Sequence, residues 1–588
     1  MIVTTSVFKR VDYTLDQLLA GISLGTIGLP DIQRPFIWKA VRVRDLFDSM
    51  YQGYPVGHLL LWAHPGAEGA KDVGAEDKPK SPDVLILDGQ QRLTSLYSVM
   101  CDKRVRDKDH QTYRIQIAFN PLSGTFAVPD AAITRDPEYI ADITELWNSG
   151  EGGFAFTTRF LESLQASREL STQERKTIAD NISRLEALEK YPFIGLELAG
   201  TLEEERAAEV FVRINSEGVT LKQADFILTL MSVFQEKLRV QLEEFSREAR
   251  QPSATGPSPF NYFIHPSPDQ LLRVSVGVAF FRGRLKHVYT MLRGKDMETG
   301  ETSPEIRDRQ FKELGNAQEQ VLDLTTWLSF HKALMSAGYA SGDLISSENA
   351  ILYAYTLFIL GKNRFAVDHS ALRRAIARWF FMSSLTGRYT NSPESAIEED
   401  LAKFRNKTTA AEFLAVLDQE IAAALTPDYW AITLPNDLAT SAARSPTLFA
   451  YYAALRLLRA QVLFSNLTVT ELLDPAIKGK KSAVDRHHLF PRGYLKKTGN
   501  DELRSINQIA NFTLVEWEDN IDISDDPPSA YFPECERKFT RVHGTEALGA
   551  QYAAHALPES WWMLDYETFL IKRRSLMAAV IRQAFDTL

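Results

Sequence analysis

One short stretch near the C-terminal end restricts the local fold more than any other part of the chain. The run 484–491 reads Val-Asp-Arg-His-His-Leu-Phe-Pro, and three asparagines follow it in order; the polar members are Asp485, His487, His488, Asn507, Asn511 and Asn520. We predict that residues 486–491 form one arm of a β-hairpin and that a basic loop continues to Asn500. Residues 507–514 then carry a helical turn into a second strand.

This set contains the residue types that hydrolysis of a phosphodiester bond requires. A base must take a proton from water, and a hard cation must stabilise charge on the phosphate and on the leaving oxygen. A histidine, whose pKa is near neutral, suits the first task. Carboxylate, amide oxygen and imidazole suit the second and leave room for substrate oxygens.

The charge around these residues favours a nucleic-acid substrate. Between Ala476 and Asn500 there are seven Lys or Arg residues and a single acid, Asp485. A basic run is often only a solvated surface, a histidine pair is often structural, and an isolated asparagine is often a cap or a turn. The full ordered set inside a basic window nevertheless favours a nuclease site.

The size and composition of the whole chain set the wider limits. At 588 residues the chain is too long for one hydrophobic core, so we expect two to four domains. Its net charge of −10 argues against a protein that coats nucleic acid non-specifically. No apolar run approaches the roughly 20 residues of a membrane span. Two cysteines and an N-terminus without a secretory pattern fit a reducing cytoplasm.

Hydrophobic periodicity predicts an α+β, multidomain chain. Residues 7–231 read as mixed α/β, with strands expected at 54–62, 84–87 and 112–119 and with two capping boxes, at 201–204 and 220–223, that each open a helix. Residues 251–258 form a break rich in Pro, Ser and Gly, and helical periodicity continues to about Leu438. Ser445 and Pro446 then begin an amphipathic helix. We therefore predict domains at 1–235, 236–444 and 445–588.

A second candidate site lies about four hundred residues upstream. Gln33 and Arg34 belong to the run Asp-Ile-Gln-Arg-Pro-Phe-Ile-Trp, and a later strand ends in the box Asp88, Gly89, Gln90, Gln91 and Arg92. A glycine between a strand and a helix lets backbone N–H groups approach a phosphate, and arginines can fork onto its oxygens. The alternative is a tight turn with an exposed arginine. No GK[ST] triplet is present, so the pocket is not of the Walker type.

The C-terminal motifs resemble the HNH domain, with its ββα-metal fold, of GmrSD-type restriction enzymes. The resemblance implies that His488 is the general base, that Asp485 or His487 binds the cation with Asn520, and that Asn511 pins the loop through backbone hydrogen bonds. Asn507 could take the pinning role instead. Many relatives carry an acid where this chain has His487, which leaves the division of metal binding between His487 and Asp485 open.

The N-terminal motifs resemble the ParB-like nucleotidase half of the same family. The boxes at 33–38 and 87–96 carry this resemblance together with the run Phe211 to Asp225, which contains Arg213 and Asn215. It implies nucleotide binding and hydrolysis at residues 88–92, and also at Gln33, Arg34, Arg213 and Asn215. The likeness covers roughly residues 10–235 and 445–535, as in family members that fuse both halves in one chain.

Together these features predict a restriction endonuclease that depends on a nucleotide and on Mg²⁺ or Mn²⁺. The resemblance implies double-stranded DNA with hydroxymethylated or glucosylated cytosine as substrate, a nucleoside triphosphate (ATP, GTP or CTP) as cofactor, and 5′-phosphate products. One active site cuts one strand, so we expect a homodimer at least transiently. Two alternatives are a nucleotide-switched DNA-binding protein with an inactive HNH-like domain and an RNA-targeting toxin.

Overall fold

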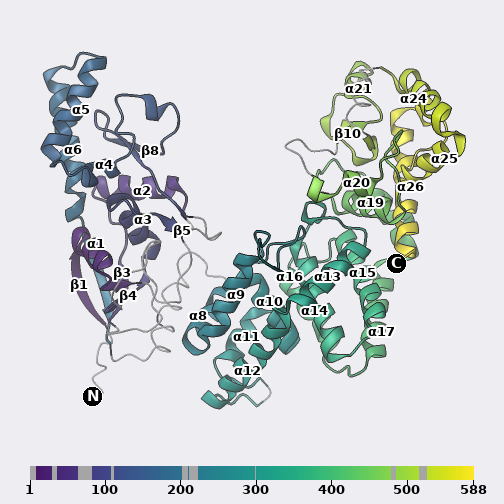
Figure 1. Cartoon of the computed structure of the whole chain (residues 1–588), viewed down its shortest axis with the longest axis horizontal. Helices are drawn as coiled ribbons and strands as arrows, with labels where there is room; N and C mark the ends of the chain where they lie inside the picture. Colours follow the sequence, from purple (N-terminus) through teal and green to yellow (C-terminus); the bar gives the residue numbers. More distant parts are fainter. Residues whose placement is uncertain are drawn as a thin grey trace. The chain divides into compact units, whose positions relative to one another are not determined.

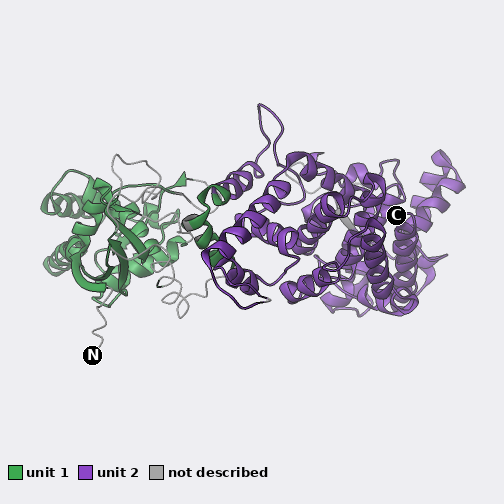
Figure 2. Cartoon of the chain, turned by 90° about the horizontal axis from the view of Figure 1, so that it is seen from below, with its two compact units in different colours: residues 1–239 green, residues 240–588 purple. Residues whose placement is uncertain are grey.

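The computed structural model describes most of the chain in two compact units, Met1–Arg239 and Val240–Leu588 (Figure 2). The described residues are 8–28, 36, 38–63, 82–106, 112–200, 210, 223–297, 299–477, 485–515 and 526–588. Both the helical middle region and the C-terminal hairpin lie in the second unit. The division into three domains therefore remains a prediction.

The first unit is built on a five-stranded mixed sheet in the order β1-β9-β3-β4-β2. β1 (Phe8–Thr14) runs antiparallel to β9 (Pro192–Leu198), and β9 runs parallel to β3 (Leu59–Ala63). β3 is antiparallel to β4 (Val84–Asp88), which pairs in parallel with the short β2 (Ile27–Gly28). The strand that carries the predicted nucleotide box is thus paired on both sides.

Helices pack against this sheet through apolar side chains. α1 (Leu15–Leu24), α2 (Ala40–Tyr51) and α3 (Gln90–Met100) contribute Leu18, Phe47 and Leu96 to one buried cluster that also contains Ile86 of β4. The helical spacing predicted for α3 is confirmed, because Leu93, Leu96, Val99 and Met100 are all buried. The unit also contains α4 (Thr144–Asn148), α5 (Gly153–Ser167), α6 (Thr172–Glu186) and α8 (Gln223–Phe234) (Figure 1).

Two of the predicted strands differ from the structure. The strand expected at 54–62 begins only at Leu59, because the chain turns at Gly53 and Gly57, which both have positive φ. The strand expected at 112–119 is wrong as a single element: β6 (Thr112–Tyr113) pairs with β5 (Val105–Arg106), whereas β7 (Ala118–Asn120) pairs with β8 (Thr125–Ala127). Most of the two capping-box segments lies outside the described residues.

The second unit begins as a helical array, as the periodicity predicts for residues up to Leu438, and the boundary at Val240 falls within the first helix of this array. The helices of this region are α9 (Glu236–Glu248), α10 (Pro268–Phe280), α11 (Leu285–Leu292), α12 (Pro304–Val321), α13 (Leu324–Ser336), α14 (Glu348–Ile359), α15 (His369–Leu385), α16 (Pro393–Ala402), α17 (Ala410–Ala424) and α18 (Leu434–Asp437). Trp327 and Phe330 of α13 and Tyr355 of α14 are fully buried. Their rings form an aromatic core with centroids 4.9–6.3 Å apart.

The C-terminal part of this unit surrounds a two-stranded hairpin with helices. The hairpin strands are β10 (Asp485–His488) and β11 (Phe512–Val515). The helices are α19 (Pro446–Leu457), α20 (Val469–Leu472), α21 (Arg492–Lys497), α22 (Leu503–Ile506), α24 (Pro528–His543), α25 (Thr545–Ala554) and α26 (Tyr566–Asp586). Ser445 and Pro446 begin α19, as predicted. Among the described helices, none is long and apolar enough to cross a membrane.

Two predictions for this region need correction. The hairpin arm expected at 486–491 ends at His488, because residues 489 and 490 form a bend. The segment after Pro491 was expected to be a basic loop up to Asn500, but residues 492–497 form helix α21. Pro491 lies at its N-cap position with an extended backbone (φ −57°, ψ 142°), which is usual for the residue that precedes a helix. Leu495 on this helix is fully buried, so the turn of helix is held by packing, while Arg492 and Lys496 face solvent.

Candidate functional sites

The C-terminal hairpin brings the predicted base and the predicted asparagines together. β10 and β11 pair antiparallel, with His488 opposite Phe512 and His487 opposite Thr513. Cross-strand partners share a face of the sheet. The His488 ring accordingly packs on the Phe512 ring, with centroids 4.4 Å apart.

Asn507 fixes the orientation and the tautomer of His488. Its side-chain Oδ1 lies 3.0 Å from His488 Nε2. An amide oxygen can only accept, so Nε2 must carry the hydrogen and donate it. No other described group hydrogen-bonds the ring, so Nδ1 keeps its lone pair available. The arrangement leaves one imidazole nitrogen able to accept a proton.

The surroundings of His488 also favour its neutral form. Burial lowers the pKa of the ring below its usual value, and the nearby positive charge of Arg492 lowers it further, whereas the hydrogen bond with Asn507 acts in the opposite direction. A general base must be unprotonated before the reaction. The lowered pKa therefore keeps the ring ready to accept a proton at neutral pH.

Asn511 holds the chain that follows His488. It is fully buried, its Oδ1 accepts from the Phe490 N–H at 2.8 Å, and its Nδ2 donates to the carbonyls of Phe490 at 3.1 Å and Ile506 at 3.0 Å. The Leu489 N–H also donates to the backbone carbonyl of Asn511 at 2.8 Å. Asn511 thus makes the main-chain contacts, and Asn507 contacts the histidine ring.

His487 lies on the other face of the hairpin. Successive side chains of a strand point to opposite faces. The ring of His487 is only 6% exposed and lies edge-on to Tyr531 of α24, with centroids 6.1 Å apart. Tyr531 in turn donates through its hydroxyl to the Leu489 carbonyl at 2.6 Å. His487 therefore does not share the face on which His488 meets Asn507.

A buried polar network, which the sequence motifs did not reveal, supports the hairpin from behind. The Thr513 hydroxyl lies 2.8 Å from His555 Nδ1, and His555 Nε2 lies 2.8 Å from the Gln461 carbonyl. Arg573, fully buried, donates to the Ala510 carbonyl at 2.7 Å and to the His555 carbonyl at 3.2 Å. The sequence could have identified these residues only if their burial were known. Helical periodicity alone does not show whether an arginine is buried or exposed.

Part of the predicted metal set lies outside the described structure. Asn520 is not among the described residues, and Asp485 is described through its backbone in β10 but not through its side chain. Among the described residues there is no group of three His, Cys, Asp or Glu side chains placed to hold a metal ion. The assignment of Asp485, His487 and Asn520 to a cation therefore remains a prediction.

The N-terminal box lies where β4 passes into α3, as the sequence predicts. Gly89 is the N-cap residue of α3 and has a φ of +98°. A Cβ atom there would lie 2.3 Å from Leu59 Cδ2, which is far inside van der Waals contact. The positive φ favours glycine, and any larger residue would also have to displace the Leu59 side chain.

Arg92 is directed at the protein's own backbone. Its Nη1 donates to the Val56 carbonyl at 2.5 Å, and its Nη2 donates to the His58 carbonyl at 2.7 Å and contacts Asp88 Oδ2 at 3.3 Å. Only 14% of the side chain is exposed. Burial lowers the pKa of this guanidinium, an effect that the charge of Asp88 opposes. In the described geometry the Arg92 guanidinium is therefore hydrogen-bonded to the backbone of the loop that precedes β3.

The other predicted nucleotide residues are only partly described. Gln90 is buried, Gln91 is half-buried, and the Asp88 side chain is 40% exposed. Gln33, Arg34, Arg213 and Asn215 lie outside the described residues. Trp62 is buried and Trp38 packs against the core cluster, so neither forms an open aromatic surface.

Comparisons with known proteins relate the first unit to restriction enzymes. Residues 15–232 match the family described as GmrSD restriction endonuclease, N-terminal domain. An uncharacterised protein of Methanocaldococcus jannaschii is 21% identical over 546 residues, which span 87% of this chain and 84% of that protein. The family match covers β2, β3, β4 and β9 of the sheet, including Asp88 at the end of β4, and leaves out the edge strand β1. The likeness to the archaeal protein extends over most of both chains.

Proposed function

We propose that this protein is a restriction endonuclease that cuts modified DNA at an HNH-type site in its C-terminal hairpin. The observation that carries the proposal is the 3.0 Å contact between His488 Nε2 and Asn507 Oδ1, which leaves Nδ1 available to a water molecule. The match of residues 15–232 to the N-terminal domain of GmrSD restriction endonucleases supports the same activity.

In this proposal His488 acts as the general base. Nδ1 takes the proton from the attacking water, and the Asn507 carboxamide keeps the ring from turning during the transfer. Asn511 fixes the backbone at Phe490 and thereby holds the turn that follows the base. Arg492, exposed on α21 next to the histidine, provides positive charge for the phosphate backbone.

A hard divalent cation, Mg²⁺ or Mn²⁺, fits carboxylate and amide oxygens, the donor types that Asp485 and Asn520 carry. When bound, such an ion stabilises negative charge on the scissile phosphate and on the leaving oxygen. We assign its ligation to Asn520 together with Asp485 or His487, as the family resemblance implies. His487 is buried and packs edge-on against Tyr531, so in the described structure it is a packing residue of the hairpin.

For the first unit we propose nucleoside triphosphate binding at the start of α3. Gly89 is the N-cap residue of this 11-residue helix, and a helix N-terminus favours a phosphate. Arg92 stabilises the loop at Val56 and His58 and leaves direct phosphate contact to the backbone and to Gln33, Arg34, Arg213 and Asn215. In this proposal, nucleotide hydrolysis in the first unit controls DNA cleavage in the second unit.

The proposed substrate is double-stranded DNA with hydroxymethylated or glucosylated cytosine. A single hairpin site cuts one strand, so a double-strand break requires two protomers or two successive nicks. We propose at least a transient homodimer. Sedimentation that shows only monomer, with and without nucleotide and DNA, would remove the dimer from the proposal.

The deciding experiment compares unmodified, hydroxymethylated and glucosylated DNA of one sequence, with and without nucleoside triphosphate and Mg²⁺ or Mn²⁺. Cutting of modified DNA that depends on the divalent ion is the expected result. Binding of DNA without any cutting would favour a nucleotide-switched binding protein instead. A matched RNA substrate tests the third alternative in the same assay.

A further inference from the structure

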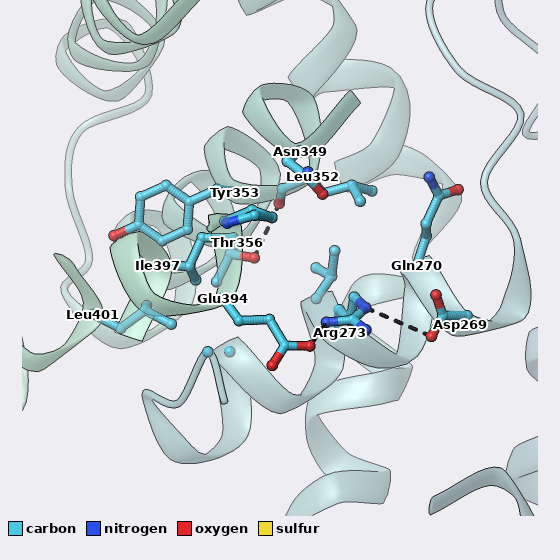
Figure 3. A pocket seen from close by; sticks show the side chains of 14 residues that line it. Asp269, Gln270, Arg273, Asn349, Leu352, Tyr353, Thr356, Glu394, Ile397 and Leu401 are labelled. Carbon is cyan, nitrogen blue, oxygen red and sulfur yellow. Dashed lines mark hydrogen bonds and ion pairs between the residues drawn. The ribbon is translucent and has the colours of Figure 1, made fainter. Parts of the chain in front are cut away.

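A cavity of about 250 Å³ lies among three helices of the second unit, within the helical region to which no motif assigns a role. Its lining comes from α10, α14 and α16, and Figure 3 shows side chains of these helices around it. The floor is apolar and buried: Val274, Leu352 and Leu401 are at most 5% exposed. The hollow has the size of a small ring-shaped ligand.

The charges at the rim exclude an anionic ligand. Arg273 Nη1 contacts Glu394 Oε1 at 2.6 Å, and Arg273 Nε lies 3.5 Å from Asp269 Oδ1. Two carboxylates therefore surround one guanidinium. Phosphate sites have a surplus of positive charge, which this rim lacks. The occupant must be neutral or positively charged.

The rim offers hydrogen-bond acceptors that the described protein does not use. Asp269 Oδ1 is buried and has no hydrogen-bond partner among the described residues beyond the long ion pair with Arg273. Asn349 is half-buried at the rim and donates weakly from Nδ2 to the Tyr389 carbonyl at 3.4 Å, so its Oδ1 can accept from a ligand, whereas Asp269 Oδ1 is the buried acceptor. Buried acceptors normally find donors. A ligand with several O–H or N–H groups supplies them.

The position of these groups suits a ring that lies on an apolar floor. In Figure 3 the side chains of Asp269, Arg273 and Glu394 lie on one side of the hollow, and Asn349 and Leu352 of α14 lie on the other. The segment after α10 also approaches α16 closely, because a Cβ at Gly283 would lie 2.6 Å from the Glu398 nitrogen. Carboxylates and an amide around an apolar floor match the alternating polar edge and apolar face of a sugar ring.

We infer that this cavity binds a neutral, hydroxyl-bearing ring, namely the hexosyl group or the hydroxymethylated base of modified cytosine. The inference rests on the proposed function, because an enzyme that reads a modified base must take that group out of the helix. A free hexose in solution carries the same chemistry. DNA phosphates stay outside, since Asp269 and Glu394 repel them.

The test uses Asn349→Ala and Glu394→Gln in the full chain. Glu399→Gln is the matched control, because Glu399 is an exposed carboxylate of the same helix α16 that does not line the cavity. Calorimetric titration with methyl glucoside and with duplexes carrying cytosine, hydroxymethylcytosine or its glucosylated form measures the affinity of each variant. Thermal unfolding reports whether each variant remains folded.

We expect each cavity variant to bind glucosylated or hydroxymethylated DNA about tenfold more weakly than the wild type does, and to bind unmodified DNA with unchanged affinity. Glu399→Gln should bind all three duplexes like the wild type. Binding of methyl glucoside alone that is lost in Asn349→Ala would support the cavity even if no DNA is cut. If the wild type cuts modified DNA and both folded variants keep its full preference, the inference is overturned and the proposed nuclease survives. If the wild type binds none of the probes, the inference is also overturned.

Discussion

The two motif-bearing sites use their polar side chains in opposite ways. In the C-terminal hairpin, Asn507 occupies one nitrogen of His488 and leaves the other available. At the N-terminal box, the protein's own carbonyls at Val56 and His58 occupy the Arg92 guanidinium. A motif residue therefore becomes a candidate for chemistry through the atoms that the fold leaves available, and not through its type alone.

The largest expected effect is that of His488→Ala. Loss of a general base lowers the rate of DNA cleavage by about 10²–10⁴-fold, while nucleotide turnover in the first unit stays at the wild-type rate. His543→Ala, which removes an exposed histidine of α24, is the control and should cut normally. If His488→Ala lost DNA cleavage and nucleotide hydrolysis to the same extent, the two reactions could not be assigned to two separate sites.

The second effect concerns the orienting contact. Asn507→Ala removes the acceptor of the His488 Nε2–H, so the ring can turn and the tautomer is no longer fixed. We expect kcat for cleavage to fall by about 10- to 100-fold with little change in KM. Asn507→Asp keeps an acceptor oxygen and should retain more activity than the alanine variant. If the two variants lose the same activity, Asn507 has no orienting role.

The third effect tests Arg92 as a structural residue. Arg92→Ala leaves the Val56 and His58 carbonyls without their donor, and we expect a loss of about 2–3 kcal/mol in the free energy of unfolding of the first unit. Denaturant unfolding of the full chain measures it, and Arg10→Ala, an exposed arginine of β1, is the control. Unchanged stability combined with lost nucleotide affinity would instead make Arg92 a phosphate ligand.

The smallest effect comes from a buried histidine outside both sites. Among the described residues neither nitrogen of His331 has a hydrogen-bond partner, and burial lowers its pKa to about 3. The unfolded chain therefore binds more protons between this value and the unfolded pKa of about 6.5, so stability falls as the pH drops through that window.

His331→Phe removes this group from an aromatic cluster in which Phe263 already stacks on the ring. We expect the variant to be more stable than the wild type by about 1 kcal/mol at neutral pH, because no unpartnered polar atom is buried. Its unfolding free energy should also depend less on pH between 4 and 6.5. Urea unfolding at pH 4.5 and 7.5 measures both, and an unchanged pH dependence would contradict the account of His331.

The sequence was informative where residue spacing encodes a local contact. The 3.6-residue period placed α3, and the strand that ends at Asp88 and Gly89 is where it was expected. The sequence could not show that residues 112–119 form two short strands. Alternation of apolar and polar residues along one segment does not show with which strand each part pairs.

For the hairpin, the order of the motif predicted that His488 and the later asparagines lie close together. It could not decide which asparagine contacts the ring and which holds the backbone, since both have the same chemistry and differ only in position. Nor could it reveal Thr513, His555 and Arg573, whose contacts join segments more than forty residues apart. Those contacts depend on tertiary packing.

The most direct test of the central claim is the cleavage of modified DNA by His488→Ala with and without added imidazole, in the presence of Mg²⁺ or Mn²⁺. If His488 Nδ1 accepts the proton of the attacking water, the variant is nearly inactive alone, and free imidazole restores part of its activity. Cleavage by the variant at the wild-type rate without imidazole would contradict the assignment of the base.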